Sequence, residues 1–222
     1  MNKIKYIAAV LIAMAGLGLQ QAKADVCSFN LNSGNPGING FTGPYANVTI
    51  NQVGNTATIT YTSLTNSGNI YLMGDGSSVA LNVNATTFTV GTITGTNGGG
   101  GSSGPFTANF GSQQVDGWGH FNFTIDSFDG FGHSSDSITF TLTNTSGSWL
   151  DCHDVLSLND ASQVAASHIF VAVDGTTYVN LNATGYAAGN GNGTGVPDGG
   201  TTVMLLGVAL GALGMARRFL MG

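Results

Sequence analysis

Apolar residues occupy every second position in several separate segments of this chain. A period of two places these side chains on one face of a β-strand and the intervening threonines and asparagines on the other. Glycine and asparagine between the segments, as at Gly54-Asn55, fit hairpin turns because both tolerate a positive φ. The alternating sets are Val48 and Ile50; Ala57, Ile59 and Tyr61; Val79, Leu81 and Val83; Phe121, Phe123 and Ile125; and Ile138, Phe140 and Leu142.

This pattern predicts an all-β fold, an antiparallel β-sandwich of the jelly-roll-like kind. We expect the sandwich to span residues 25–189, which is an ordinary size for one domain with its own core. The one short helix that we predict inside it runs from Asp160 to Ala166, with Asp160 as the N-cap.

Positive charge is confined to the two ends of the chain. All eleven acidic residues are aspartates, and residues 25–216 contain no lysine or arginine. Affinity for nucleic acid depends on cations that neutralise phosphates, so this composition excludes nucleic acid as a partner. The five cationic residues are Lys3, Lys5, Lys23, Arg217 and Arg218.

Residues 1–24 have the order of a secretory signal peptide. Two lysines precede an apolar run from Ile7 to Leu19, and the small-x-small sequence Ala22-Lys23-Ala24 follows. We therefore expect export by the secretion machinery and cleavage by signal peptidase between Ala24 and Asp25.

The C-terminal region combines a spacer, a short motif, an apolar run and two arginines. Residues 190–195 are a Gly/Asn spacer, and residues 196–222 hold the sorting and anchor region. The apolar run at 201–216 would span about 24 Å as a helix, slightly less than the hydrocarbon core of a bilayer. Because positive residues stay cytoplasmic, Arg217 and Arg218 orient such a transmembrane helix with the preceding domain outside.

The motif is Val196-Pro197-Asp198-Gly199-Gly200, and with the apolar run and Arg217-Arg218 it resembles the PEP-CTERM sorting signal in its Val-Pro-Asp variant. The resemblance implies that the chain is a substrate of an exosortase, a membrane cysteine peptidase that cuts near the motif. Anchoring by such a tail would be transient, because the tail is removed. Through the stretches 117–126, 138–143, 165–171 and 183–189, residues 105–190 also resemble exported domains found with this tail. This resemblance implies a cell-surface or extracellular location and an association with exopolysaccharide or a biofilm matrix.

The chain has two cysteines, Cys27 and Cys152. In an exported protein they meet an oxidising compartment in which a disulfide persists. We predict a bridge between them; free thiols or an intermolecular bond are the alternative.

Several polar residues are candidates for metal binding or catalysis. Asp126, Asp129 and Asp136 surround a glycine-containing loop and offer the oxygen ligands that Ca²⁺ accepts, but no known calcium-loop spacing is matched and turn capping is the favoured role. Adjacent residues of a strand point to opposite faces, so Cys152-His153-Asp154 is a poor catalytic triad. Asp126 and Asp129 are the pair on which an Asp-based hydrolase would depend.

Four aromatic residues, Trp118, Phe121, Phe123 and Phe128, are able to stack on sugars, but aromatics at strand spacing also form cores. The sequence therefore favours a non-enzymatic exported surface or matrix protein with no cofactor, apart from possible Ca²⁺. A carbohydrate-binding β-sandwich module is the alternative, and an Asp-based hydrolase is the third hypothesis.

Overall fold

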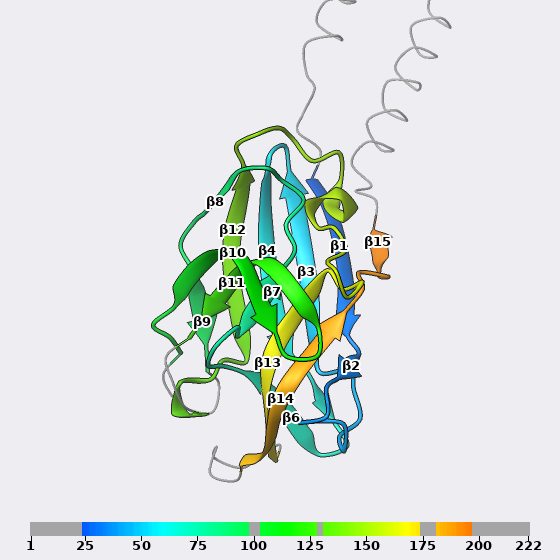
Figure 1. The fold of residues 1–222 in the computed structure, drawn as a ribbon, viewed down its shortest axis with the longest axis vertical. Helices are drawn as coiled ribbons and strands as arrows, with labels where there is room; N and C mark the ends of the chain where they lie inside the picture. The colour runs from blue at the N-terminus through cyan, green and yellow to red at the C-terminus, as the bar shows by residue number, and fades with distance from the viewer. Residues whose placement is uncertain (1–23, 98–102, 128–130, 174–180, 197–222) are drawn as a thin grey trace, which may run out of the picture.

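The computed structural model describes residues 24–97, 103–127, 131–173 and 181–196. These residues form antiparallel strands in two sheets, which confirms the predicted all-β class (Figure 1). Sheet I has the order β15 (Thr194–Val196), β1 (Ala24–Leu31), β3 (Ala46–Val53), β4 (Thr56–Ser63), β12 (Ser137–Asn144) and β8 (Phe88–Val90), with β9 (Thr94–Thr96) also paired to β12.

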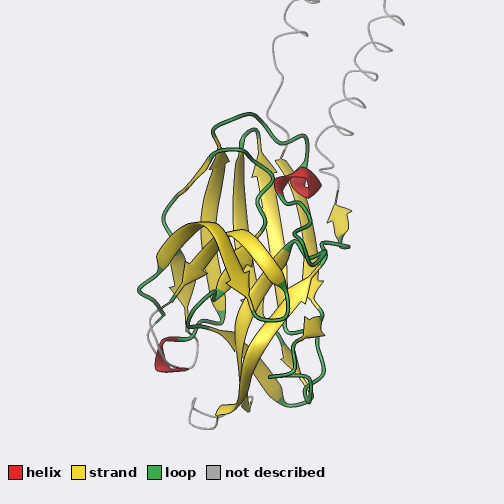
Figure 2. Cartoon of the chain, in the orientation of Figure 1, coloured by secondary structure: helices red, strands yellow, loops and turns green. Residues whose placement is uncertain are grey.

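Sheet II has the order β10, β11, β7, β13, β14 and β2, and β6 pairs with both β13 and β5. Its strands are β2 (Ser33–Gly34), β5 (Thr65–Asn66), β6 (Asn69–Met73), β7 (Val79–Leu81), β10 (Thr107–Val115), β11 (Gly119–Asp126), β13 (Ala165–Val173) and β14 (Leu181–Gly189). Two short 3-10 helices, η1 (Phe131–His133) and η2 (Cys152–Val155), lie in connecting segments (Figure 2).

The alternation in the sequence corresponds to the observed burial. In β12, Ile138, Phe140 and Leu142 are buried, whereas the threonines between them are partly exposed. The main core contains side chains from both sheets, such as Ile59 of β4 and Phe123 of β11, so the two sheets form a sandwich. The finer jelly-roll assignment stays a prediction.

Strand β13 departs from simple alternation because both of its faces are covered. Eight of its nine residues are buried. Ile169 belongs to the main core, whereas Phe170 packs with Leu72 in a smaller cluster on the other face. A strand that is buried on both faces reads as a nearly continuous apolar run, and residues 165–173 are apolar except for Ser167 and His168, which are also buried.

The predicted helix from Asp160 to Ala166 is wrong. The Asn159 side-chain oxygen accepts hydrogen bonds from the backbone N–H groups of Ala161 at 3.0 Å and Gln163 at 2.9 Å. This local capping turns the chain tightly, and β13 begins at Ala165. A side chain that bonds its own following backbone stabilises a turn in place of a helix.

The predicted signal peptide, apart from Ala24, and the predicted C-terminal transmembrane helix lie outside the described residues. Among the residues that are described, no helix is long and apolar enough to cross a membrane.

Candidate functional site

The two ends of the described chain pair with each other at one end of sheet I. Val26 of β1 is opposite Val196 of β15, and Cys27 is opposite Gly195. The expected spacer therefore ends in a short strand, and the motif begins inside that strand. Pro197, Asp198, Gly199, Gly200, Arg217 and Arg218 lie outside the described residues.

The expected signal-peptidase site lies at the same place. Ala24 and Asp25 are the first two residues of β1, and they pair with Val53 and Gln52 of β3. We call this end of the sandwich the processing end. Its residues are Ala24 and Asp25, Gln52 and Val53, Trp149 to Asp151, and Val196. Figure 1 shows β1 starting and β15 ending toward this end.

The predicted disulfide between Cys27 and Cys152 is confirmed. The two Cα atoms are 5.9 Å apart, and both cysteines are buried. The backbone N–H of Cys152 also donates to the Asp25 carboxylate at 3.2 Å. The bridge and this hydrogen bond together hold the start of β1 against η2.

Helix η2 owes its start to Asp151, whose carboxylate accepts from the N–H groups of His153 at 2.9 Å and Asp154 at 3.1 Å. The Asp154 carboxylate accepts in turn from the Leu150 N–H at 3.2 Å and from Asn84 at 2.9 Å. The Cys152-His153-Asp154 sequence therefore offers no free thiol, because Cys152 is in the disulfide, and its aspartate holds the preceding loop.

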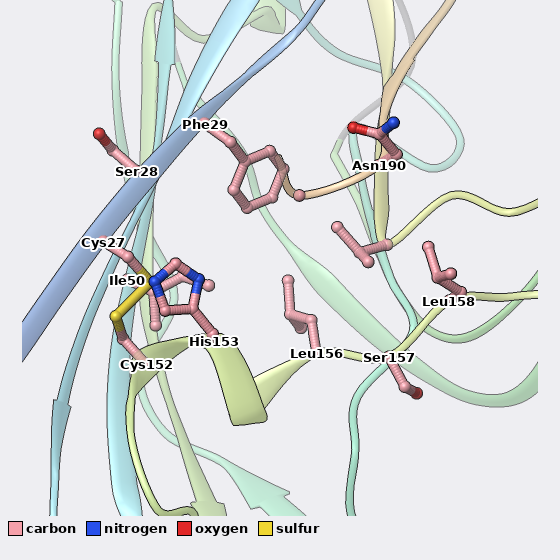
Figure 3. A pocket seen from close by; sticks show the side chains of 12 residues that line it. Cys27, Ser28, Phe29, Ile50, Cys152, His153, Leu156, Ser157, Leu158 and Asn190 are labelled. Carbon is pink, nitrogen blue, oxygen red and sulfur yellow. A yellow bond between two sulfur atoms is a disulfide. The ribbon is translucent and has the colours of Figure 1, made fainter. Parts of the chain in front are cut away.

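A cavity of about 350 Å³ opens beside the disulfide (Figure 3). Apolar side chains form much of its wall, and His153 and Asn190 contribute polar groups. A ring nitrogen of His153 lies within 4.8 Å of the sulfurs of Cys27 and Cys152. The residues that line the cavity are Cys27, Ser28, Phe29, Ile50, Cys152, His153, Leu156, Ser157, Leu158, Val164, Asn190 and Gly191.

A second, polar pocket of about 440 Å³ lies next to the processing end. Trp149, one of its lining residues, is buried and donates its indole N–H to the Asn84 carbonyl at 2.8 Å, while Gln52 donates to the Trp149 carbonyl at 3.1 Å. Its lining residues are Val83, Asn84, Ala85, Thr86, Asn144, Ser146, Gly147, Ser148, Trp149 and Asp154. Sequence reasoning missed this pocket, because three separate segments build it and no single motif marks it.

The aspartates proposed for Ca²⁺ hold different loops. Asp126 accepts from the Ser77 N–H at 2.7 Å with one oxygen and from Asn109 at 2.9 Å with the other. Asp136 accepts from the Thr96 hydroxyl, and Asp129 lies outside the described residues. In the described part of the chain, the potential metal-ligand atoms of three residues lie close together, and these residues are Cys27, Cys152 and His153. The two cysteine sulfurs are bonded to each other in the disulfide.

Two of the aromatic residues considered for sugar stacking are core residues. Phe121 and Phe123 are 1% and 0% exposed, so their faces are closed to a ligand. Phe128 lies outside the described residues. Trp118 is half-buried between β10 and β11, and its indole N–H donates to the Tyr186 carbonyl at 3.1 Å.

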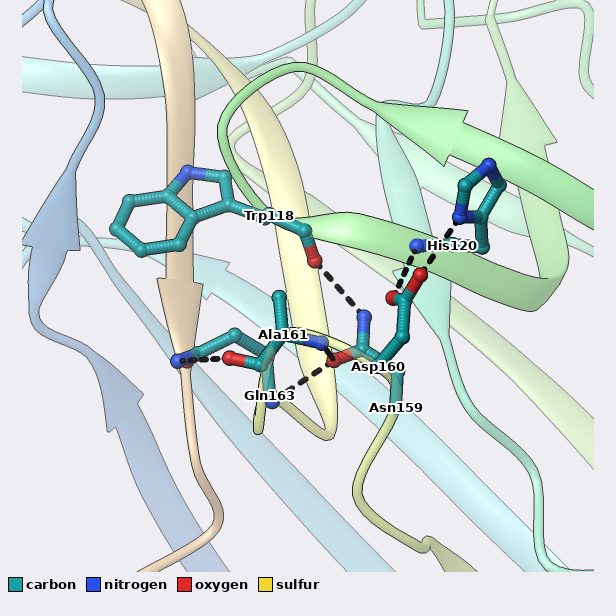
Figure 4. Close-up of polar contacts among 6 residues, drawn as sticks. All are labelled: Trp118, His120, Asn159, Asp160, Ala161 and Gln163. Atoms are coloured by element: carbon teal, nitrogen blue, oxygen red, sulfur yellow. Dashed lines mark hydrogen bonds and ion pairs between the residues drawn. The ribbon is translucent and has the colours of Figure 1, made fainter.

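Beside Trp118, an exposed hydrogen-bonded pair, His120 and Asp160, joins the β10–β11 hairpin to the turn before β13 (Figure 4). The His120 ring nitrogen is 2.8 Å from the Asp160 carboxylate, which also accepts from the His120 N–H at 2.8 Å. These bonds lower the pKa of Asp160. The Asn159 side chain donates to the Trp118 carbonyl at 2.8 Å, which adds a second connection between the two loops.

His168 on β13 is a buried histidine that the sequence did not single out. Its ring stacks on Tyr186 with a centroid distance of 4.4 Å. The Thr184 hydroxyl donates to the Ile169 carbonyl at 3.1 Å and therefore accepts from Nε2 of His168, at 2.7 Å. The Nδ1 atom has no hydrogen-bond partner, and burial lowers the pKa of His168 against the opposing attraction of Asp75.

The comparison with protein families gives a match on the C-terminal tail. Residues 195–219 match the VPDSG-CTERM motif, a sorting signal of the PEP-CTERM-like type. The chain has Gly199 where the name of the motif has serine. The motif implies export with transient membrane anchoring. No curated protein and no solved structure matches the chain.

Proposed function

We propose that this chain is a non-enzymatic protein of the cell surface or extracellular matrix, associated with exopolysaccharide or biofilm. It leaves the cytoplasm by the secretion machinery and loses its signal peptide between Ala24 and Asp25. An exosortase-type peptidase then acts near Val196 to Gly200. The observation that carries this proposal is the match of residues 195–219 to a sorting motif.

The fold of the described residues supports this order of events. The core of the sandwich is built from residues between Cys27 and Ala187. The tail follows β15, so its removal takes no residue from that core. A domain of this kind is able to keep its structure when the anchor is cut away.

The intact mass of the extracellular form tests the proposal. We expect a chain that begins at Asp25 and ends near Pro197. A Pro197→Ala, Asp198→Ala variant should retain the tail and stay with the membrane, whereas Asn192→Ala, an exposed change just before the motif, should be processed normally. An extracellular form that retains residues 201–222 would contradict the sorting proposal.

Carbohydrate binding is a second candidate function, and the polar pocket favours it. Amides, hydroxyls and the Asp154 carboxylate line this pocket, and such groups donate to and accept from sugar hydroxyls. Thr86 and Ser148 are exposed lining hydroxyls whose loss should disturb little else. Glycan-array binding that Thr86→Val, Ser148→Ala abolishes would assign the ligand to the pocket, whereas loss on Trp118→Ala would assign it to the β10–β11 hairpin.

Calcium binding and Asp-based hydrolysis have separate tests. A rise in melting temperature with Ca²⁺ beyond that from NaCl at matched ionic strength would establish a calcium site at Asp126, Asp129 and Asp136. Polysaccharide turnover that Asp126→Asn abolishes would establish the hydrolase. Equal effects of Ca²⁺ and NaCl, and no turnover, would dismiss both hypotheses.

A further inference from the structure

The chain enters and leaves the sandwich at the processing end. The pairing of Val26 with Val196 fixes this arrangement, since it sets β1 and β15 antiparallel at the edge of sheet I. The segments that contain the apolar sequences at 7–19 and 201–216 are therefore joined to the same region of the domain.

Both apolar sequences are close in sequence to this end. Thr201 follows Val196 by five residues, and Leu19 precedes Ala24 by five. A fully extended chain of five residues reaches at most about 18 Å. While either segment is in the bilayer, the processing end is thus held within about 18 Å of the membrane surface.

Two large apolar side chains are exposed at this end. Leu150 is 90% exposed and Val53 is 42% exposed. They belong to neighbouring segments, because Gln52, next to Val53, donates to the carbonyl of Trp149, next to Leu150, at 3.1 Å. A leucine this exposed contributes nothing to the core, and its apolar surface is accessible to a partner.

We propose that the processing end docks on the outer surface of the bilayer while the chain is anchored, with Leu150 and Val53 entering the lipid interface. The inference rests on the anchoring in the proposed function and goes beyond it by assigning a lipid-contact surface to the folded domain. Neutral lipid headgroups are the fitting partner, because Asp25, Asp151 and Asp154 beside the apolar pair repel an anionic surface.

Docking of this kind depends on the anchor. Burying one leucine raises the ratio of docked to undocked domain by only about tenfold to a hundredfold. This is sufficient to dock a domain that the anchor already holds at the membrane, and too weak to bind a free domain. Removal of the tail therefore releases the domain from the membrane surface. During anchoring, the docked state keeps residues 196–200 next to the bilayer in which a membrane peptidase acts.

Trp149 provides a reporter, because it is next to Leu150 and the chain has two tryptophans. In a Trp118→Phe background, the chain with its tail intact is inserted into phosphatidylcholine nanodiscs with and without bromine on the upper acyl chain. Bromine quenches nearby indoles, so we expect lower Trp149 emission in brominated lipid. Replacing Leu150 and Val53 by asparagine should lower the docked-to-undocked ratio at least about tenfold and restore the emission.

Leu158→Asn is the matched control, since Leu158 is an exposed leucine outside the processing end, and it should remain quenched. The disulfide and the circular dichroism spectrum of each variant establish that it is folded. A chain that enters the nanodisc without Trp149 quenching overturns the docking inference alone. A chain that fails to enter overturns the anchoring itself, and docking with it.

Discussion

Removing the Cys27–Cys152 bridge should destabilise the exported domain strongly. The perturbation is the double variant Cys27→Ser, Cys152→Ser, which leaves no unpaired thiol. The bridge joins residues separated by 125 positions. A closed loop of that length lowers the entropy of the unfolded chain enough to contribute about 5 kcal/mol to stability.

The loss corresponds to a fall in melting temperature of about 10 to 20 °C for a domain of this size. Both cysteines are buried, so the serine hydroxyls need new partners and add to the cost. The Asp25 carboxylate accepts from the Cys152 N–H at 3.2 Å, and this bond is able to survive the change and offset a small part of the loss.

The assay is thermal unfolding of the exported form, followed by far-ultraviolet circular dichroism. Wild-type protein reduced with dithiothreitol is the control, because it loses the same cross-link without any change of sequence. We expect the reduced protein and the double variant to melt within a few degrees of each other. A melting temperature that both treatments leave unchanged would refute the loop-entropy reasoning.

Three further predictions follow from single features of the chain. Burial lowers the pKa of His168 in the folded state, so the unfolded state takes up the proton first as pH falls below the ordinary histidine value of about 6.5. Stability should therefore decrease as the pH falls from 7 to the lower folded-state pKa. In that range the urea midpoint of His168→Gln should depend less on pH than the midpoint of the unsubstituted protein does. Gly119 has a φ of +79°, and a Cβ there would collide with Asp160, so Gly119→Ala should cost about 1 to 3 kcal/mol in urea unfolding. Gly40→Ala, whose Cβ meets nothing within 4 Å, should cost less than Gly119→Ala. Residues 25–216 contain no Lys or Arg, so trypsin should leave the processed protein with an unchanged intact mass even when it is unfolded and reduced; trimming at Lys23 or Arg217 would contradict processing at that end.

The sequence predicted the features that depend on local pattern or on counting. Strand β12 could be predicted because Ile138, Phe140 and Leu142 alternate with threonines over one half-exposed strand. The disulfide could be predicted because two cysteines in an exported chain have one intramolecular pairing.

The features that the sequence did not predict depend on distant segments. The Asp160 to Ala166 region has an N-cap residue, but the side chain of Asn159 caps a turn, and sheet II takes the residues from Ala165 into β13. The polar pocket needs residues from three segments, and the pairing of β15 with β1 joins residues about 170 positions apart. Local propensity carries no information about such contacts.

On the outer face of sheet I, neutral threonine pairs join β4 to β12 where a domain with lysine or arginine could use ion pairs. Thr60 of β4 and Thr139 of β12 are opposite each other, and their hydroxyls are 3.0 Å apart. Thr56 and Thr143 form a second pair at 3.4 Å. Cross-strand threonine pairs contribute a fraction of a kcal/mol each, and salt does not screen a contact between neutral hydroxyls as it screens an exposed ion pair. An exported protein meets varying ionic strength, and the small contribution of these neutral hydroxyl pairs to stability is one that salt does not screen.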